Sequence, residues 1–315
     1  MAKAKKPRTT KGETKDEMPA PTRPHWPPPG TWFVDATTDV AALDYCLLGN
    51  DLRHAVSREE LRLVYQPLKD IRTHEVVGFE ALLRWRHTTR GEVPPAEFVP
   101  IAEDTGSILQ IGEWVLRTAC REAATWIKPL TVAVNVSAVQ IHHANFAHVV
   151  HQILFETGLA PARLELEITE TALIHDLDGA LATLRRIKTL GVRVVMDDFG
   201  TRYSSLSNLL AFPFDKIKID GSFIKSVNAN EKAAAVVHAV LGLGRALKLQ
   251  VLAEEVERTD QLEFLEDELC NQAQGYLLGR PRKIESFRDL THGNVKPSLI
   301  DAPRSVQSKQ RRRRA

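Results

Sequence analysis

The sequence predicts an α/β protein, a TIM-like (β/α)8 barrel with an irregular first strand. Short apolar segments alternate with helical patterns about eight times over roughly 240 residues, which agrees with the ~250 residues of a typical α/β barrel. The connection Leu68–Val76 is too short for a crossover helix, so we expect the first two strands to pair antiparallel through a hairpin. An open doubly wound sheet is the alternative. No G-x-G-x-x-G motif follows the first strand, which disfavours the dinucleotide-binding version of that sheet.

The expected strands are short runs rich in apolar and β-branched residues, as in buried parallel sheets. They are Val64–Leu68, Val76–Trp85, Thr131–Val136, Leu164–Thr169, the run from Gly191 into Asp197, Ile217–Asp220, Gln250–Glu254 and Ala273–Leu278. The expected helices carry apolar residues three and four positions apart. They are Asp51–Leu63, Ile108–Ile127, Asn145–Glu156, Leu177–Leu190, a short piece near Ser204, Glu231–Leu247, Asp260–Leu269 and Ile284–Leu290.

The composition is that of an ordinary globular protein and excludes several classes. Of the 315 residues, 43% are hydrophobic and 26% are charged, and a net charge of +2 implies no nucleic-acid partner for the folded part. No apolar run reaches the ~18 residues of a membrane span, and the Lys-rich amino end lacks the apolar segment of a signal peptide. Cys46, Cys120 and Cys270 lie far apart in no metal-binding spacing, which favours a reducing, cytoplasmic setting.

The chain is predicted to hold one barrel domain between two tails. Residues 1–30 are charged and then Pro-rich, so we expect a disordered basic tail, followed by a linker or lead-in segment over 31–51. The barrel is expected over 52–291, and a second disordered basic tail over 292–315. The closing run Arg311–Arg314 is typical of a solvated end, with a contact to anionic lipid or nucleic acid as the alternative.

Two adjacent carboxylates, Asp197 and Asp198, end one of the expected strands. Side chains at the carboxyl ends of parallel strands face the active site of an α/β barrel. Two neighbouring Asp residues that lose hydration there repel each other, so we expect a divalent cation beside them. An exposed Asp-Asp turn is the alternative interpretation.

Other expected strands also end in side chains that can bind a cation or move a proton. They are Gln66, Glu80, Asn135, Glu167, Lys218, Glu254 and Gln274. In a barrel these ends meet at one mouth, where carboxylate and amide oxygens suit Mg²⁺ or Mn²⁺. Two such ions about 3.5–4 Å apart are the arrangement used for phosphodiester cleavage, and Lys218 would contact anionic oxygens or hold the attacking water. Capping of the following helices, which Glu167 and Glu170 could do, is the alternative for single residues.

Several blocks resemble the EAL-domain family of cyclic-di-GMP phosphodiesterases over roughly residues 52–291. Residues 79–85 read FEALLRW and contain the tripeptide that names the family. The other blocks occur in the family's order: YQP (65–67), VNVSAVQ (134–140), EITE (167–170), DDFGTRYSSL (197–206), KIKIDGSFI (216–224), AEEVE (253–257) and QGYLLGRP (274–281). A lone EAL tripeptide carries no information, whereas this ordered set is specific.

The resemblance implies an enzyme that cuts one phosphodiester bond of cyclic di-GMP, giving linear pGpG, with two Mg²⁺ or Mn²⁺ ions. The implied metal ligands are Glu80, Asn135, Glu167, Asp197 and Asp198. The implied catalytic residues are Glu254 as ligand or base, Lys218 as the group that orients the water, and Glu170 as the anchor of the loop after Asp198. The implied substrate contacts are Gln66, Arg84 and Gln274. Family likeness alone suggests a homodimer.

Arg202 and Glu255 depart from the family pattern, which usually has Gly at both positions. A glycine there would allow a positive φ or a close backbone approach, which Arg or Glu resists. Glu255 would point away from the face that carries Glu254 if the strand continues. The second hypothesis is therefore a catalytically impaired cyclic-di-GMP receptor or a protein-interaction module.

Overall fold

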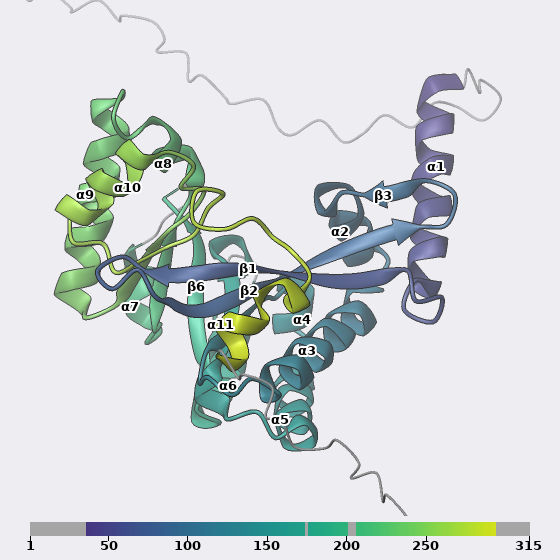
Figure 1. Cartoon of the computed structure of the whole chain (residues 1–315). Helices are drawn as coiled ribbons and strands as arrows, with labels where there is room; N and C mark the ends of the chain where they lie inside the picture. Colours follow the sequence, from purple (N-terminus) through teal and green to yellow (C-terminus); the bar gives the residue numbers. More distant parts are fainter. Residues whose placement is uncertain (1–35, 174–175, 201–205, 294–315) are drawn as a thin grey trace, which may run out of the picture. The chain divides into compact units, whose positions relative to one another are not determined.

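The computed structural model describes residues 36–173, 176–200 and 206–293 (Figure 1). The chain divides into two compact units, residues 1–44 and 45–315. Of the first unit the structure describes residues 36–44, the beginning of helix α1 (Ala36–His54). The predicted tails lie almost entirely outside the described residues. None of the helices in the described part is long and apolar enough to cross a lipid bilayer.

The second unit contains a closed barrel of eight strands, and one further short strand, β3 (Gly91–Val93), pairs with β2 beside the ring. The strands are β1 (Leu61–Asp70), β2 (Val76–His87), β3 (Gly91–Val93), β4 (Thr131–Asn135), β5 (Leu164–Thr169), β6 (Arg193–Phe199), β7 (Lys216–Ile219), β8 (Gln250–Ala253) and β9 (Gln272–Ala273). Their order is β1-β9-β8-β7-β6-β5-β4-β2-β3, and a β1–β2 pairing closes the ring. β1 is antiparallel to both β2 and β9, whereas the pairs from β2–β4 round to β8–β9 are parallel. The predicted barrel and its antiparallel first strand are confirmed.

Helices follow most of the strands and cover the outside of the barrel. They are α2 (Pro95–Asp104), α3 (Ile108–Ala124), α4 (Ala138–Ile141), α5 (Phe146–Thr157), α6 (Leu177–Thr189), α7 (Leu206–Ala211), α8 (Gly221–Ser226), α9 (Glu231–Leu247), α10 (Thr259–Asp267) and α11 (Arg288–His292). Short 3-10 helices occupy Pro161–Arg163, Glu170–Leu173 and Ile284–Phe287. Side-chain caps begin several helices: Asp176 accepts from Gly179 N before α6, and Asn230 accepts from Lys232 N before α9.

Four local differences separate the predicted elements from the observed ones. The helix expected over Asp51–Leu63 ends at His54, because Leu61, Leu63 and Tyr65 alternate as strand residues and are buried in β1. The strand expected over Ala273–Leu278 stops at Ala273. The predicted helix over Ile284–Leu290 is a 3-10 turn followed by α11. β3, α2, α4 and α8 were not predicted, and the piece expected near Ser204 lies outside the described residues before α7.

The two faces of the barrel strands bury different chemistry. Leu164, Leu166 and Ile168 of β5 belong to the main apolar core, whereas the alternate residues Glu165 and Glu167 are buried on the opposite face. A separate small cluster, Leu68, Ala133 and Leu252, comes from β1, β4 and β8 and fills the barrel interior. The barrel interior thus holds a small apolar cluster together with buried charged residues.

Two buried ion pairs cross the interior between strands that are not neighbours. Nζ of Lys216 lies 2.6 Å from Oε2 of Glu165, and Nζ of Lys218 lies 2.9 Å from Oε2 of Glu167. Glu167 lies two residues after Glu165 in β5, and Lys218 lies two residues after Lys216 in β7. The Lys218–Glu167 pair is therefore nearer to the carboxyl ends of the strands. That is the end at which α/β barrels carry their active sites.

Candidate active site

The predicted site residues other than Glu170 lie together at the carboxyl-terminal mouth of the barrel. Asn135 is the last residue of β4, and Glu254 and Gln274 follow directly after β8 and β9. Gln66 and Glu80 correct the prediction, because they lie in the middle of β1 and β2 and do not end them. Gln66 and Glu80 are register partners in the antiparallel pair of β1 and β2, and Glu80 is also the register partner of Ala133 in β4. Beyond this level β1 and β2 extend past the barrel, so both side chains lie at its mouth.

Lys218 is the centre of the site. Its Nζ lies 2.8 Å from Oε1 of Glu254, 2.9 Å from Oε2 of Glu167, 3.2 Å from Oδ2 of Asp197 and 3.9 Å from Oε1 of Glu80. Its side chain is 1% exposed. The four carboxylates come from β5, β6, β2 and the residue after β8, so four separate segments place their charges around a single ammonium group.

A chain of amides fixes the carboxylate of Glu80. Asn135 Nδ2 donates to its Oε1 at 2.6 Å, and Gln274 Nε2 donates to its Oε2 at 2.6 Å. Gln274 also donates to Oε1 of Gln66 at 3.0 Å, and Gln66 donates to the carbonyl of Gly279 at 3.1 Å. The buried Oε1 of Gln274 has no hydrogen-bond partner among the described residues. The network leaves that acceptor available to a ligand.

Asp197 and Asp198 share the cavity because β6 has a bulge there. The register with β7 advances from Met196–Ile217 to Phe199–Ile219, so three residues of β6 match two of β7. Asp198 takes the left-handed conformation with φ 55°, and its N–H donates to Oδ1 of Asp197 at 2.9 Å. Adjacent residues of a regular strand would point to opposite faces. The bulge therefore turns both carboxylates to one side.

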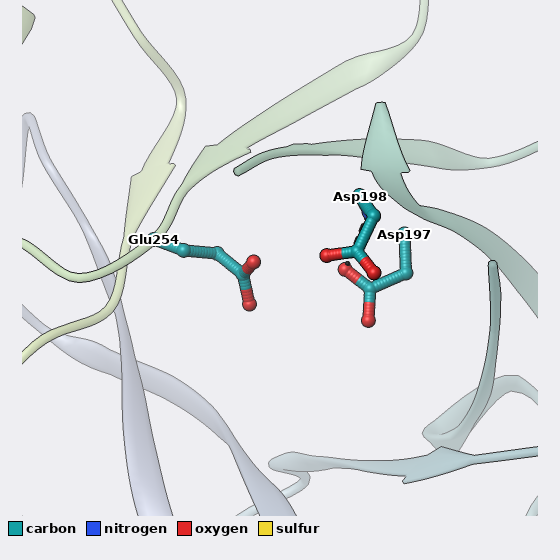
Figure 2. Close-up of side chains that lie close together, drawn as sticks. All are labelled: Asp197, Asp198 and Glu254. Atoms are coloured by element: carbon teal, nitrogen blue, oxygen red, sulfur yellow. Dashed lines mark hydrogen bonds between the residues drawn. The ribbon is translucent and has the colours of Figure 1, made fainter. Parts of the chain in front are cut away.

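Three carboxylates offer ligand oxygens to one cation. Each of Asp197, Asp198 and Glu254 has a carboxylate oxygen, and these oxygens all lie within 4.8 Å of one another. Figure 2 shows the carboxylate of Glu254 pointing from the other side of the mouth towards the two aspartates. An all-oxygen set of this charge suits a hard divalent ion, so the residues fit the predicted Mg²⁺ or Mn²⁺.

Burial and mutual repulsion raise the pKa of three of these carboxyl groups. Burial, reinforced by Asp197 and Asp220, raises the pKa of Asp198 to about 6. Burial also raises the pKa of Glu254 to about 8, although the nearby Lys218 opposes the shift. The pKa of Glu167 rises well above its ordinary value for the same reason, with Glu80 and Asp197 adding to the effect of burial.

Two groups are held in their charged forms despite burial. Burial disfavours ionisation of Glu80, but Lys218 and the two amide donors outweigh it, so the pKa of Glu80 is lowered. Burial likewise disfavours the charged form of Lys218, but the surrounding carboxylates raise its pKa well above the ordinary value. The site therefore combines fixed charges with carboxyl groups that release protons near neutral pH.

The site opens into a cavity of about 560 Å³. Its lining includes Gln66, Glu80, Arg84, Asp197, Asp198, Lys218, Glu254 and Gln274, together with Asp220, Lys225, Glu255 and Tyr276. A second, more apolar cavity of about 560 Å³ shares Arg84 and also contacts Asn135 and Glu167. Arg84 is half-buried, donates to the Leu83 carbonyl at 2.8 Å and has a pKa lowered by burial. It lines both cavities.

A close backbone contact sets the loops that carry Glu254 and Gln274. A Cβ at Gly275 would collide with the backbone N, C and O atoms of Val256. Val256 N donates to the Gln274 carbonyl at 3.0 Å, and Leu277 N donates to the Val256 carbonyl at 3.1 Å. Gly275 therefore ends the expected strand Ala273–Leu278, because only glycine permits this approach.

The two remaining sequence predictions differ in how far the structure describes them. Glu170 is buried at the start of the 3-10 helix after β5, but the loop that it was expected to anchor, with Arg202, lies partly outside the described residues. Glu255 has φ 54°, so the strand does not continue. It lines the same cavity as Glu254, which corrects the expectation that it points to the opposite face.

Sequence reasoning missed Asp220, Lys225 and Tyr276 as cavity residues. Asp220 precedes α8 and Lys225 lies in its last turn, and this helix is too short for its periodicity to be recognised. Asp220 caps α8 by accepting from Ser222 N at 3.0 Å. Tyr276 was assigned to a strand that ends earlier. Its ring lies 4.3 Å from the guanidinium carbon of Arg280.

Comparison with known proteins gives one family and several relatives. Residues 49–281 match the EAL domain family. The chain is 42% identical over 262 residues to MucR of Pseudomonas aeruginosa, a bifunctional diguanylate cyclase/cyclic di-GMP phosphodiesterase, covering 82% of this chain and 38% of MucR. It is 53% identical over 240 residues to an uncharacterized signaling protein of Caulobacter vibrioides, covering 76% of this chain and 30% of that protein. The chain thus spans about a third of the length of these curated relatives.

Solved structures show the same fold. The structure of the PaMucR phosphodiesterase in complex with c-di-GMP has 43% sequence identity and a TM-score of 0.73, covering 76% of this chain and 99% of that one. The EAL domain of Mycobacterium smegmatis DcpA has 36% identity and a TM-score of 0.63, covering 73% and 97%.

Proposed function

Because the chain belongs to the EAL domain family, we propose that it hydrolyses one phosphodiester bond of cyclic di-GMP and releases linear pGpG. The observation that carries this proposal is the convergence of Asp197, Asp198 and Glu254, with ligand oxygens within 4.8 Å of one another, beside the buried Lys218. The naming of MucR as a cyclic di-GMP phosphodiesterase supports it.

The proposed ligands of two Mg²⁺ or Mn²⁺ ions are the oxygen donors at the mouth. They are Glu80, Asn135, Glu167, Asp197 and Asp198, with Glu254 as a further ligand or as base. When bound, such ions activate water and neutralise negative charge on the leaving oxygen. Its position beside Asp197 and Asp198 in the cavity, with Oε1 2.8 Å from Nζ of Lys218, supports the role of base for Glu254.

The chain's own residues would orient the reactants. Lys218 donates to Glu167 and Asp197 and lies within ion-pair distance of Glu254. Its ammonium group would exchange one of these three contacts for the attacking water beside that base. Water oxygen would attack phosphorus while Glu254 takes up a proton from the water, the bond from phosphorus to the 3′ oxygen would break, and the departing oxygen would take up a proton from solvent. Glu170 is proposed to position the loop that follows Asp198.

Gln66, Arg84 and Gln274 are the proposed substrate contacts. The guanidinium group of Arg84 presents paired donors that match a phosphodiester, and Arg84 lines both cavities, which would let it contact an extended dinucleotide. The unpartnered Oε1 of Gln274 can accept a hydrogen bond from a base or a hydroxyl group. A cytoplasmic setting and a homodimer complete the proposal.

A receptor that binds cyclic di-GMP without cleaving it is the second candidate function. The observation that favours it is Glu255, a non-glycine residue in a left-handed conformation directly after Glu254. Incubating pure protein with cyclic di-GMP and Mg²⁺ or Mn²⁺, and separating the products by chromatography, tests both. Formation of pGpG supports the enzyme. Binding without product under both ions, at neutral and moderately alkaline pH, supports the receptor.

A further inference from the structure

The rim of the cavity carries a lysine–glutamate pair outside the proposed catalytic set. Lys225 lies near the end of α8, and Glu255 is the second residue after β8. Nζ of Lys225 lies 2.5 Å from Oε2 of Glu255, and both residues line the cavity that contains Glu254. The side chains are 54% and 52% exposed, so the pair lies at the mouth and not among the buried carboxylates.

The backbone directs Glu255 towards this pair. With φ 54°, Glu255 leaves the alternation of β8 and turns its side chain over Gly221, the first residue of α8. A Cβ at Gly221 would collide with the Glu255 carboxyl group. The left-handed conformation at Glu255 and the absence of a side chain at Gly221 both favour the contact with Lys225.

Lys225 differs from the other cations that line the described part of the cavity. Lys218 is enclosed by four carboxylates, and Arg84 is half-buried and donates to a backbone carbonyl. Lys225 is exposed, and the carboxylate that it contacts, that of Glu255, is also exposed to solvent. Exposed ion pairs contribute little net stability in water, so an incoming anion can replace the carboxylate.

We propose that Lys225 contacts a phosphodiester oxygen of the substrate and that Glu255 competes with the substrate for it. Glu255 is then a residue that weakens substrate binding by neutralising Lys225 at the rim. The inference rests on the proposed function, because cyclic di-GMP supplies the phosphodiester groups. It assigns a role in affinity and adds no group to the chemical step.

A double-mutant cycle tests whether Glu255 acts through Lys225. The proteins are wild type, Glu255→Gln, Lys225→Met and the double variant, each first shown by thermal unfolding to be folded. KM for pGpG formation is measured, and Kd for cyclic di-GMP is measured by calorimetry in EDTA. Glu255→Gln should lower KM and Kd about three- to tenfold, and Lys225→Met should raise them by a similar factor. In the Lys225→Met background, Glu255→Gln should change neither, and 0.5 M NaCl should shrink the single-mutant effects.

Asp260→Asn is the matched control. Asp260 pairs with Arg258 at 2.8 Å, is similarly exposed and does not line the cavity. An equal fall in KM for Asp260→Asn would overturn the inference by tracing the effect to net charge. So would equal effects of Glu255→Gln in both backgrounds, or no effect of Lys225→Met. A wild-type protein that neither binds nor cleaves cyclic di-GMP overturns the proposed function and the inference together, whereas cleavage with unresponsive variants overturns the inference alone.

Discussion

Nζ of Lys218 lies 2.8 Å from Oε1 of Glu254, the carboxyl group whose pKa burial raises to about 8. The same ammonium group also contacts Glu167 and Asp197. One buried cation therefore compensates several buried carboxylates, which would otherwise repel one another in a poorly hydrated site. This arrangement links the stability of the barrel to the charge of its mouth.

Lys218→Met should destabilise the metal-free protein by about 3–5 kcal/mol, because it leaves buried carboxylates without their counter-charge. Mn²⁺ should restore part of this loss, since a divalent ion supplies positive charge to the same oxygens. Activity should fall by about 100-fold or more, because the group proposed to hold the attacking water is missing. Denaturant unfolding with and without Mn²⁺ measures the first two effects.

Lys216→Met is the matched control for this substitution. Lys216 pairs with Glu165 at 2.6 Å in the barrel interior, two residues before Lys218 and Glu167 on the same strands, and is as deeply buried as Lys218. It should lose comparable stability without any rescue by Mn²⁺. Equal responses of the two variants to Mn²⁺ would contradict the assignment of the ions to the mouth.

Metal binding should be coupled to proton release between pH 5 and 8.5. The pKa of Asp198 is raised from 3.8 to about 6 and that of Glu254 from 4.5 to about 8, so the folded metal-free protein holds more protons than the unfolded chain in this window. The contribution of Asp198 and Glu254 to the free energy of unfolding is fully present below their pKa values in the unfolded chain. It is lost as the pH rises through about 6 for Asp198 and about 8 for Glu254. The melting temperature of the metal-free protein should therefore fall with rising pH.

Metal affinity should rise over the same range, about tenfold per pH unit for each proton displaced. Thermal unfolding with EDTA and with Mn²⁺ should show a gap that widens from pH 5.5 to 8.5. Glu254→Gln removes the carboxyl group with the pKa of about 8, so in this variant the gap should no longer widen above pH 7. A gap of constant size in the wild type would rule out this coupling.

Much of the mouth could be predicted from sequence because the parallel strands are buried and end in polar residues. Glu167 and Lys218 lie in short strands in which apolar and charged residues alternate, LELEIT (164–169) and KIKI (216–219), and barrel closure alone brings such positions together. Gln66 and Glu80 were predicted to belong to the site, but they were expected at strand ends and lie in the middle of β1 and β2. The length of β1 and β2 depends on pairing with each other and with β3, which local patterns do not encode.

Other features of the site depend on backbone conformations that these residue types do not indicate. The bulge at Asp198 and the turn at Glu255 place non-glycine residues at positive φ, where sequence reasoning expects glycine. The stop after Ala273 depends on the contact of Gly275 with Val256, a residue 19 positions earlier in the chain. Tertiary contacts of this kind override the local strand pattern.

Gly275→Ala should displace the loops that carry Glu254 and Gln274. The new Cβ would meet the Val256 backbone, which cannot move as a flexible side chain can, so we expect a loss of about 1–3 kcal/mol and a tenfold or larger fall in activity. Gly242→Ala in α9 is the control, since a Cβ there meets nothing within 4 Å. It should stabilise the protein by about 0.5–1 kcal/mol and leave turnover unchanged. Wild-type activity of Gly275→Ala would show that the contact does not position the site.

Glu80→Gln tests the proposed metal ligand set. The carboxylate of Glu80 accepts from Asn135 and Gln274 at 2.6 Å each, so a glutamine must turn its own amide N–H towards one of these donors. We expect a loss of about 1–3 kcal/mol for the unsatisfied donor and a fall in pGpG formation of about 100-fold or more through the lost ligand. Glu92→Gln is the matched control on the neighbouring strand β3, because Glu92 forms an exposed pair with Arg62 at 2.8 Å and should matter to neither property. If Glu80→Gln cleaved cyclic di-GMP as fast as the wild type, the proposed metal ligand set would be wrong, whereas binding without cleavage by the wild type itself would favour the receptor.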